Sequence, residues 1–130
     1  MILVDTHVVI WLASDEPGLS ANAKAAIDNA RQNGEGLAVS NITLWELATA
    51  AGKGRIRLDI SVESFLAEVE ARFVVLPITA RACVRALALP TGYPKDPADR
   101  MIAATALVEG LPLLTADRAI RRSRALKTIW

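Results

Sequence analysis

Short apolar runs alternate with segments of helical spacing along the whole chain. Strands are predicted where about three apolar residues follow one another, at residues 2–4, 37–39, 74–76, 113–115 and 128–130. Helices are predicted between them, at residues 9–12, 20–34, 43–51, 61–73, 79–89, 97–109 and 117–123. Continuous apolar strands separated by helices predict an α/β/α sandwich, with a central parallel sheet of four to five short strands covered on both faces.

Composition is consistent with a single globular domain over residues 1–130. Hydrophobic residues make up 52% of the chain, and 15 basic against 14 acidic residues leave a formal charge of +1, which argues neither for nor against a nucleic-acid partner. Cys83 is alone, so neither an intrachain disulfide nor a cysteine zinc cluster is expected. Asp5 and His7 interrupt the first apolar run, which therefore predicts neither a signal peptide nor a membrane span. We expect a cytoplasmic protein.

Four acidic residues fall where a parallel sheet binds its ligands. Asp5 directly follows the first predicted strand, and Asp117 follows the strand at residues 113–115. Glu46 lies one or two turns after the strand at residues 37–39, and Asp99 lies in the first turn of the helix opened by Pro97. Ligands of such sheets bind outside the carboxyl ends of the strands, so these carboxylates are candidates for a common site.

Each acid also has a structural interpretation. Thr43 and Glu46 fit a capping box, in which Glu46 would bond back to the backbone at Thr43. Asp96 is suited to cap the helix that begins with Pro97, and Asp99 could offset the dipole of that helix. The same capping role is open to the two acids that directly follow strands, Asp5 and Asp117. Taken alone, the structural role is favoured for Glu46 and Asp96, whereas both roles stay open for Asp99 and Asp117.

The helical spacing favours a site for Asp99. It shares one stripe with Ile102, Ala103 and Ala106, which lie three, four and seven positions further on. Two like charges about 4 Å apart cost roughly 4 kcal/mol at an effective dielectric constant near 20, so converging carboxylates need compensation. A divalent cation supplies it, and a set of oxygen ligands without paired histidines or cysteines favours Mg²⁺ or Mn²⁺ over Zn²⁺.

Four stretches carry a specific resemblance. They are "ILVDTHVVIW" at the start, "VSNITLWELATAAGKGRI" from Val39, "KDPADRMIAATA" from Lys95, and "LLTAD" ending at Asp117. In order and spacing the chain resembles a PIN domain along its whole length, and among these it is similar to the VapC-type toxin ribonucleases of bacterial toxin–antitoxin pairs. Two departures from that pattern are Ala98, where Phe is expected, and Pro94, where His is frequent. They leave the acidic positions unchanged.

The resemblance implies a site and an activity. Asp5, Glu46, Asp99 and Asp117 match the acidic positions of the family, and Asp5 and Asp99 are expected to be the principal metal ligands. Supporting residues beside them are Thr6, Thr115 and Arg100, the last expected to pair with an acid or to contact phosphate. The implied reaction is Mg²⁺-dependent hydrolysis of RNA by activated water, with Mn²⁺ as a possible replacement.

Other functions remain open on the residues alone. A metal-independent ribonuclease typically needs a pair of acid–base groups, commonly histidines, and this chain has only His7, which we expect to pack or hydrogen-bond near the site. A haloacid-dehalogenase-like phosphatase would need a second Asp two residues after Asp5, where His7 stands. A non-catalytic PIN-like module that binds RNA or protein is the remaining alternative, although such modules should have lost some of the four acids.

Partners are predicted mainly from the resemblance. It implies a homodimer and an antitoxin that holds the protein inactive, and we expect a basic antitoxin side chain near Asp5 and Asp99. The helix at residues 61–73 and the helix carrying Trp45 are candidates for a groove that accepts an apolar antitoxin segment. Packing is favoured over base stacking for Trp11 and Trp45. Five basic residues near the end could bind RNA phosphates or form a solvated face, namely Arg118, Arg121, Arg122, Arg124 and Lys127.

Overall fold

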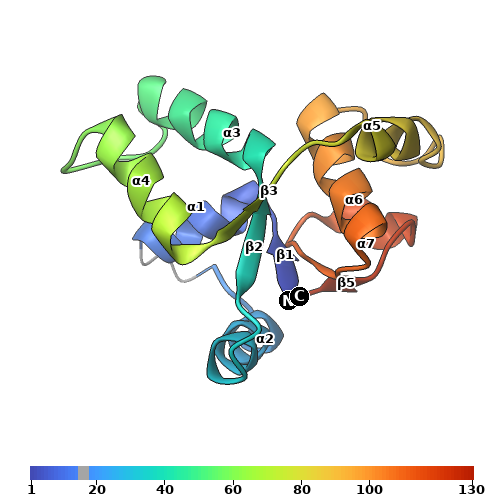
Figure 1. Ribbon diagram of the computed structural model, residues 1–130, viewed down its shortest axis with the longest axis horizontal. Coiled ribbons are helices and arrows are strands. Elements are labelled where there is room, and N and C mark those ends of the chain that lie inside the picture. Colours follow the sequence, from blue (N-terminus) through green and yellow to red (C-terminus); the bar gives the residue numbers. More distant parts are fainter. Residues whose placement is uncertain (15–17) are drawn as a thin grey trace.

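The central element of the protein is a parallel sheet of five short strands. The computed structural model describes residues 1–14 and 18–130 (Figure 1). Its strands are β1 (Ile2–Val4), β2 (Leu37–Ser40), β3 (Val74–Leu76), β4 (Leu113–Leu114) and β5 (Thr128–Ile129). They lie in the order β3-β2-β1-β4-β5, and every neighbouring pair is parallel. The predicted fold class is therefore confirmed.

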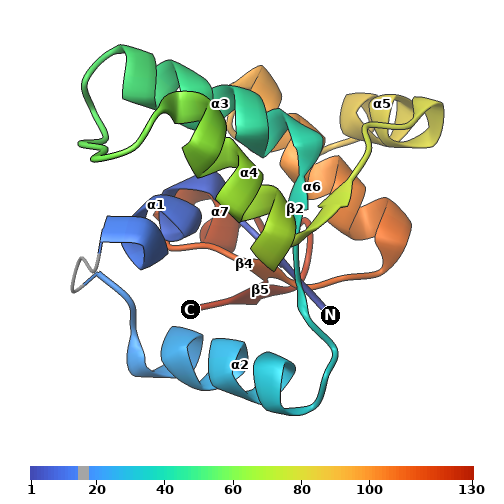
Figure 2. The same ribbon diagram turned by 60° about the vertical axis from the view of Figure 1, so that its left-hand side comes forward.

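Helices cover both faces of this sheet, as the two views in Figures 1 and 2 show. Within the described residues they are α1 (Thr6–Ser14), α2 (Ala21–Gln32), α3 (Asn41–Gly52), α4 (Val62–Arg72), α5 (Ala80–Leu87), α6 (Pro97–Glu109) and α7 (Arg118–Ser123). Core contacts place α1 to α4 on one face and α6 and α7 on the other, whereas α5 packs against α6. Among the described helices, none is long and apolar enough to span a membrane.

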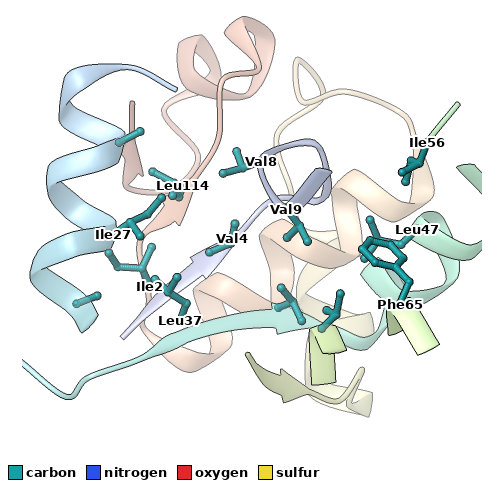
Figure 3. Packing of buried hydrophobic residues seen from close by; sticks show 14 residues of the cluster. Ile2, Val4, Val8, Val9, Ile27, Leu37, Leu47, Ile56, Phe65 and Leu114 are labelled. Atoms are coloured by element: carbon teal, nitrogen blue, oxygen red, sulfur yellow. The ribbon is translucent and has the colours of Figure 1, made fainter. Parts of the chain in front are cut away.

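Side chains that point alternately to the two faces of the sheet form two hydrophobic layers. Ile2 and Val4 of β1 belong to the core beneath α1 to α4, shown in Figure 3, whereas Leu3 between them belongs to the core beneath α6 and α7. Leu114 and Leu113 of β4 divide between the two layers in the same way. Successive side chains of a strand point to opposite faces of the sheet, and helices cover both faces. Most positions of a strand are therefore apolar, which explains why the strands read as continuous apolar runs.

Helix boundaries follow local capping, and some differ from the sequence-based predictions. Helix α6 spans the predicted residues, opens with Asp96 as N-cap and ends at Gly110, whose φ of 66° is the left-handed conformation that glycine adopts readily. Helix α3 starts two residues earlier than predicted, because the Ser40 side chain accepts the Ile42 N–H and acts as N-cap. Phe73 leaves the predicted helix and is extended at the end of α4.

Helix α1 is also longer than predicted, since it begins at Thr6 rather than near residue 9. The predicted stop of this helix at residues 15–18 lies mostly outside the described residues.

The strand order of the sheet determines where a site is expected. The order runs outward from β1 in both directions, to β2 on one side and to β4 on the other. The carboxyl ends of β1 and β4 therefore flank the point where the order reverses, which is where such sheets bind ligands.

Candidate metal centre

Asp5 is a buried carboxylate at the carboxyl end of β1. Only 4% of the residue is exposed. Its backbone N–H donates to the Leu114 carbonyl of the neighbouring strand, and its own carbonyl accepts the N–H groups of Val8 and Val9. The side chain accepts the Thr6 N–H at 2.9 Å and the Thr115 hydroxyl at 2.7 Å. Two neutral donors therefore fix the orientation of the Asp5 carboxylate.

His7 supports Asp5 and has a defined tautomer. Its Nε2 accepts the backbone N–H of Ala116 at 3.0 Å, so Nε2 carries no proton and Nδ1 does. Nδ1 lies 3.5 Å from Oδ2 of Asp5. The ring also contacts Trp11 edge-on, with the centroids 5.1 Å apart. The expectation that His7 packs and hydrogen-bonds near the site is confirmed, because both ring nitrogens and one ring edge face other protein groups.

Glu46 of α3 is connected to the same region through two threonines. Its Oε1 accepts the Thr6 hydroxyl at 2.6 Å. The Thr6 and Thr43 hydroxyl oxygens are 3.0 Å apart, and because the Thr6 proton is given to Glu46, Thr43 must be the donor in this pair. The capping-box interpretation of Glu46 is therefore wrong: Ser40 caps α3, Thr43 lies inside the helix, and Glu46 points to α1. Burial raises the pKa of Glu46 above its usual value, against the lowering effect of the Thr6 hydrogen bond.

Asp99 lies one turn into α6 and is not the cap of that helix. Asp96 has that role, accepting the Ala98 N–H at 2.8 Å as predicted. Among the described residues no donor hydrogen-bonds to the Asp99 carboxylate, whereas the backbone carbonyl of Asp99 accepts the Tyr93 hydroxyl at 3.5 Å. Partial burial and the negative charges of Asp5, Asp96, Glu46 and Asp117 raise the pKa of Asp99 to about 7.

Asp117 and Thr115 link the end of β4 to this cluster. Asp117 caps α7 by accepting the Ile120 N–H at 3.0 Å, and its own N–H donates to the Thr115 hydroxyl oxygen at 3.1 Å. The Thr115 hydroxyl in turn donates to Asp5. The capping interpretation of Asp117 is thus confirmed, and the carboxylate is also close enough to Asp99 to raise its pKa. For Asp117 the role of helix cap and the role of candidate site residue are therefore compatible.

A surface hollow of about 550 Å³ joins three of the predicted acids. Asp5, Glu46 and Asp99 line it, whereas Asp117 stands outside its lining. Its remaining wall is formed by Thr6, His7, Ile10, Ile42, Trp45, Thr49, Ala50, Arg55, Asp96, Pro97 and Ala98. Trp45 is 69% exposed there, so it does not pack in the core, and packing at an interface stays a prediction. Its ring forms part of the wall instead.

Among the described residues Arg100 pairs with no acid, contrary to one of its two predicted roles. Its Nη2 donates to the Tyr93 carbonyl at 3.3 Å, and within the described part of the chain it forms no ion pair. Tyr93 is 1% exposed, and burial raises the pKa of its phenol, so the hydroxyl remains a donor. Sequence reasoning missed Tyr93 and Thr43. The only signal for Tyr93 was an aromatic residue in an otherwise polar loop, and Thr43 was mistaken for a cap.

The donor set fits a hard divalent cation with a water-rich shell. Among the described residues, no three His, Cys, Asp or Glu side chains are grouped closely enough to hold one ion together. Asp99 nevertheless lacks a protein donor and lies among like charges, an arrangement that a cation would relieve. Mg²⁺ is usually bound through one or two carboxylates and retains several waters, so this geometry suits it better than it suits Zn²⁺.

Comparison with known proteins agrees with this fold. Residues 2–126 match the model of the PIN domain, and the chain belongs to that family. It is 39% identical to Ribonuclease VapC22 of Mycobacterium tuberculosis over 131 residues, covering 99% of this chain and 98% of that protein. The resemblance based on four short stretches is therefore confirmed over the whole chain.

Solved structures of similar fold come from toxin–antitoxin systems. The DNA-bound VapBC from Salmonella typhimurium matches with a TM-score of 0.72 at 26% identity, covering 98% of this chain and 97% of that chain. A toxin–antitoxin complex from Klebsiella pneumoniae matches with a TM-score of 0.61 at 26% identity, covering 90% of this chain and 87% of that chain.

Proposed function

We propose that the protein is the toxin of a toxin–antitoxin pair and acts as a metal-dependent endoribonuclease. The observation that carries this proposal is the convergence of Asp5, Glu46 and Asp99 on one hollow at the carboxyl edge of a PIN-domain sheet. The relationship to Ribonuclease VapC22 over nearly the whole chain supports RNA as the substrate.

Each carboxylate has a distinct part in this proposal. Asp5, fixed by Thr6 and Thr115, and Asp99, which has no protein donor among the described residues, would hold Mg²⁺ or Mn²⁺ directly. Glu46, oriented by Thr6, and Asp117, fixed as a helix cap, would hold waters around the ion. A bound divalent cation would supply a water of lowered pKa and positive charge beside the scissile phosphate.

The bond changes follow from water as the nucleophile. The water gives up a proton to solvent as its oxygen forms a bond to phosphorus. The bond from phosphorus to the 3′ oxygen breaks, and the leaving 3′ oxygen takes up a proton from solvent. The products are a 5′-phosphate and a 3′-hydroxyl. Tyr93 and Arg100 act indirectly, since they hold the loop before α6 and thereby the first turn that carries Asp99.

A cleavage assay on purified protein tests this proposal. We expect an unstructured RNA to be cut in Mg²⁺ with 5′-phosphate and 3′-hydroxyl ends, and cutting to stop in excess EDTA. Asp5→Asn should abolish cutting, whereas Asp28→Asn on the exposed face of α2 is the matched control and should retain it. Undiminished cutting in EDTA, or products with a 2′,3′-cyclic phosphate, would contradict the proposal. A wild-type protein that binds RNA without cutting it would favour the non-catalytic module.

An antitoxin is the proposed protein partner. A groove of about 680 Å³ lies between α1, α4 and residues 56–60, and apolar side chains including Leu12, Ile56 and Phe65 line it. It suits an apolar antitoxin segment. The predicted helix at residues 61–73 contributes to this groove, whereas Trp45 lines the carboxylate hollow instead. A basic side chain of the antitoxin placed in that hollow would neutralise Asp5 and Asp99 and compete with the metal.

We also propose a homodimer, from an exposed apolar face on α5. Helix α5 exposes Val84 and Leu87, whose exposed fractions are 68% and 86%. Adjacent apolar side chains at such exposure are typical of an interaction surface. Sedimentation of the wild type and of a Val84→Glu, Leu87→Glu double variant tests this face: we expect a dimer for the first and a monomer for the second. A wild-type monomer at micromolar concentration would contradict it.

A further inference from the structure

Four arginines surround a second hollow, separate from the carboxylates. Arg118, Arg121, Arg122 and Arg124, here called the arginine cluster, line a hollow of about 420 Å³ at α7. All four side chains are exposed, and within the described part of the chain none of them forms an ion pair. The segment from Arg118 to Trp130 contains no acid, so the positive charge of the cluster is not neutralised locally.

The backbone at Arg124 has the left-handed conformation that is common at the end of a helix, and Arg124 is the C-cap of α7. Its φ of 53° lies in the left-handed region, where a Cβ atom is sterically disfavoured. The other described residues with positive φ are all glycines, at positions 34, 36, 54 and 110. Arginine thus occupies a C-cap position whose backbone favours glycine, so a glycine there is expected to be tolerated by the fold.

The cluster also begins beside the candidate metal centre. Asp117 caps α7, and its N–H donates to the Thr115 hydroxyl, which in turn donates to Asp5. Arg118 is the next residue after Asp117. A phosphodiester chain approaching Asp5, Glu46 and Asp99 meets repulsion from their charges, and a net charge of +1 gives little long-range attraction. Attraction for a polyanion must therefore come from a local concentration of cations close to the acids.

We propose that the arginine cluster binds backbone phosphates of the RNA substrate and positions the strand at the carboxylates. This inference rests on the proposed function, in which RNA is the substrate. Guanidinium groups present paired N–H donors that match phosphate oxygens, which favours arginine over lysine for such contacts. The arginines are positioning residues, because they contact phosphates away from the scissile bond and take no part in the bond changes.

Arg124→Gly is the variant that separates binding from folding. It removes one guanidinium and also relieves the left-handed strain, so its unfolding temperature should equal or exceed that of the wild type. Binding of a fluorescent unstructured RNA oligonucleotide is measured by anisotropy in EDTA, across a range of salt concentrations. We expect affinity to fall roughly two- to fivefold and the slope of log K against log salt to weaken by about 0.7 per lost phosphate contact.

Three further measurements give this test its controls. Arg124→Asn, which also tolerates the left-handed backbone, should behave like Arg124→Gly. Arg31→Gln on α2 removes an exposed arginine elsewhere and should leave affinity and salt slope unchanged. In Mg²⁺, Arg124→Gly should raise KM for RNA and leave kcat within about twofold, as expected for a residue that contributes uniform binding.

Wild-type affinity and slope in Arg124→Gly would overturn the inference, as would an equal loss in Arg31→Gln, which would indicate a general charge effect. A loss confined to duplex DNA, with RNA binding unchanged, would assign the cluster to DNA and overturn it as well. Failure of the RNA-binding inference can be distinguished from failure of the proposed nuclease function. RNA binding that depends on the cluster, in a protein that cuts no RNA in Mg²⁺, would support the cluster and contradict only the nuclease.

Discussion

Helices α6 and α7 both begin with an aspartate at the carboxyl edge of the sheet, but they use their acids differently. In α7 the capping acid and the site acid are the same residue, Asp117, whose carboxylate accepts the Ile120 N–H. In α6 the two roles are divided between Asp96, which accepts the Ala98 N–H, and Asp99, which has no protein donor among the described residues. A carboxylate already occupied by a helix N–H has less capacity for a cation, so we expect Asp99 to be the stronger of the two candidate ligands.

Among the substitutions considered, the largest loss of RNA cleavage is expected for Asp99. Asp99→Asn should lower metal-dependent RNA cleavage on the order of a hundredfold or more, because it removes a proposed metal ligand. The same change should raise the unfolding free energy of the metal-free protein at pH 8, since an unfavourable charge is lost, and should have little effect at pH 4. Chemical denaturation in EDTA at the two pH values checks this. A variant that is inactive and also destabilised at pH 8 would indicate a structural role.

The raised pKa of Asp99 predicts a pH dependence with a definite sign. Because that pKa is about 7 in the folded metal-free protein, against 3.8 as the ordinary value, the folded state holds this proton more tightly than the unfolded state does. This group therefore makes the unfolding free energy fall as pH rises from about 4 to 7. Mg²⁺ must displace the proton, so its apparent affinity should rise by up to about tenfold per pH unit below 7 and level off above it.

Calorimetric titration with Mg²⁺ from pH 5.5 to 8.5 measures that dependence. In Asp99→Asn the dependence should be much reduced, leaving only the weaker contribution of Glu46, whose pKa is also raised. An affinity for Mg²⁺ that is independent of pH in the wild type would contradict the assignment of Asp99 as a ligand.

Substitution of Asp117 should lower RNA cleavage moderately, and its effect on the unfolding free energy should depend on the residue introduced. Asp117→Ala removes the cap of α7 and should lower the unfolding free energy by about 1 kcal/mol, whereas Asp117→Asn retains a capping side chain and should stay close to the wild type. Cleavage should fall in both variants, but less than in Asp99→Asn, because Asp117 is proposed to act through water. Equal stability of the two variants would mean that the cap contributes nothing.

The smallest effect is expected for Asp96. Asp96→Asn preserves the cap of α6 and removes one of the charges that raise the pKa of Asp99. Cleavage should remain within a few-fold of the wild type, and the pH at which Mg²⁺ binding levels off should shift slightly downward. A loss of activity comparable to that of Asp99→Asn would show that the two acids had been assigned in the wrong order.

The sequence was sufficient for the sheet, because its strands are apolar on both faces and therefore stand out as continuous runs. It was also sufficient for α6, where Asp96, Pro97 and Gly110 mark the ends in residue types with narrow conformational preferences. It failed at α3. Ser40 and Thr43 are both suitable caps, and the choice between them depends on where β2 ends, which is a property of the sheet.

The contacts of the candidate site could not have been predicted in the same way. The link from Thr43 through Thr6 to Glu46 joins α1 and α3, and the role of Arg100 depends on the fold of the loop that carries Tyr93. Such contacts between segments distant in sequence leave no local signal. Trp45 shows the same limitation, since helical spacing cannot distinguish a core stripe from the wall of a hollow.

The most direct test of the central claim is a crystal structure of the protein soaked in Mn²⁺, with the ion located by its anomalous scattering. We predict one ion bound directly by carboxylate oxygens of Asp5 and Asp99, with water as its remaining ligands and Glu46 and Asp117 reached through those waters. An ion bound elsewhere, with the Asp5 and Asp99 carboxylates more than about 6 Å apart, the range over which direct charge coupling acts, would contradict the account.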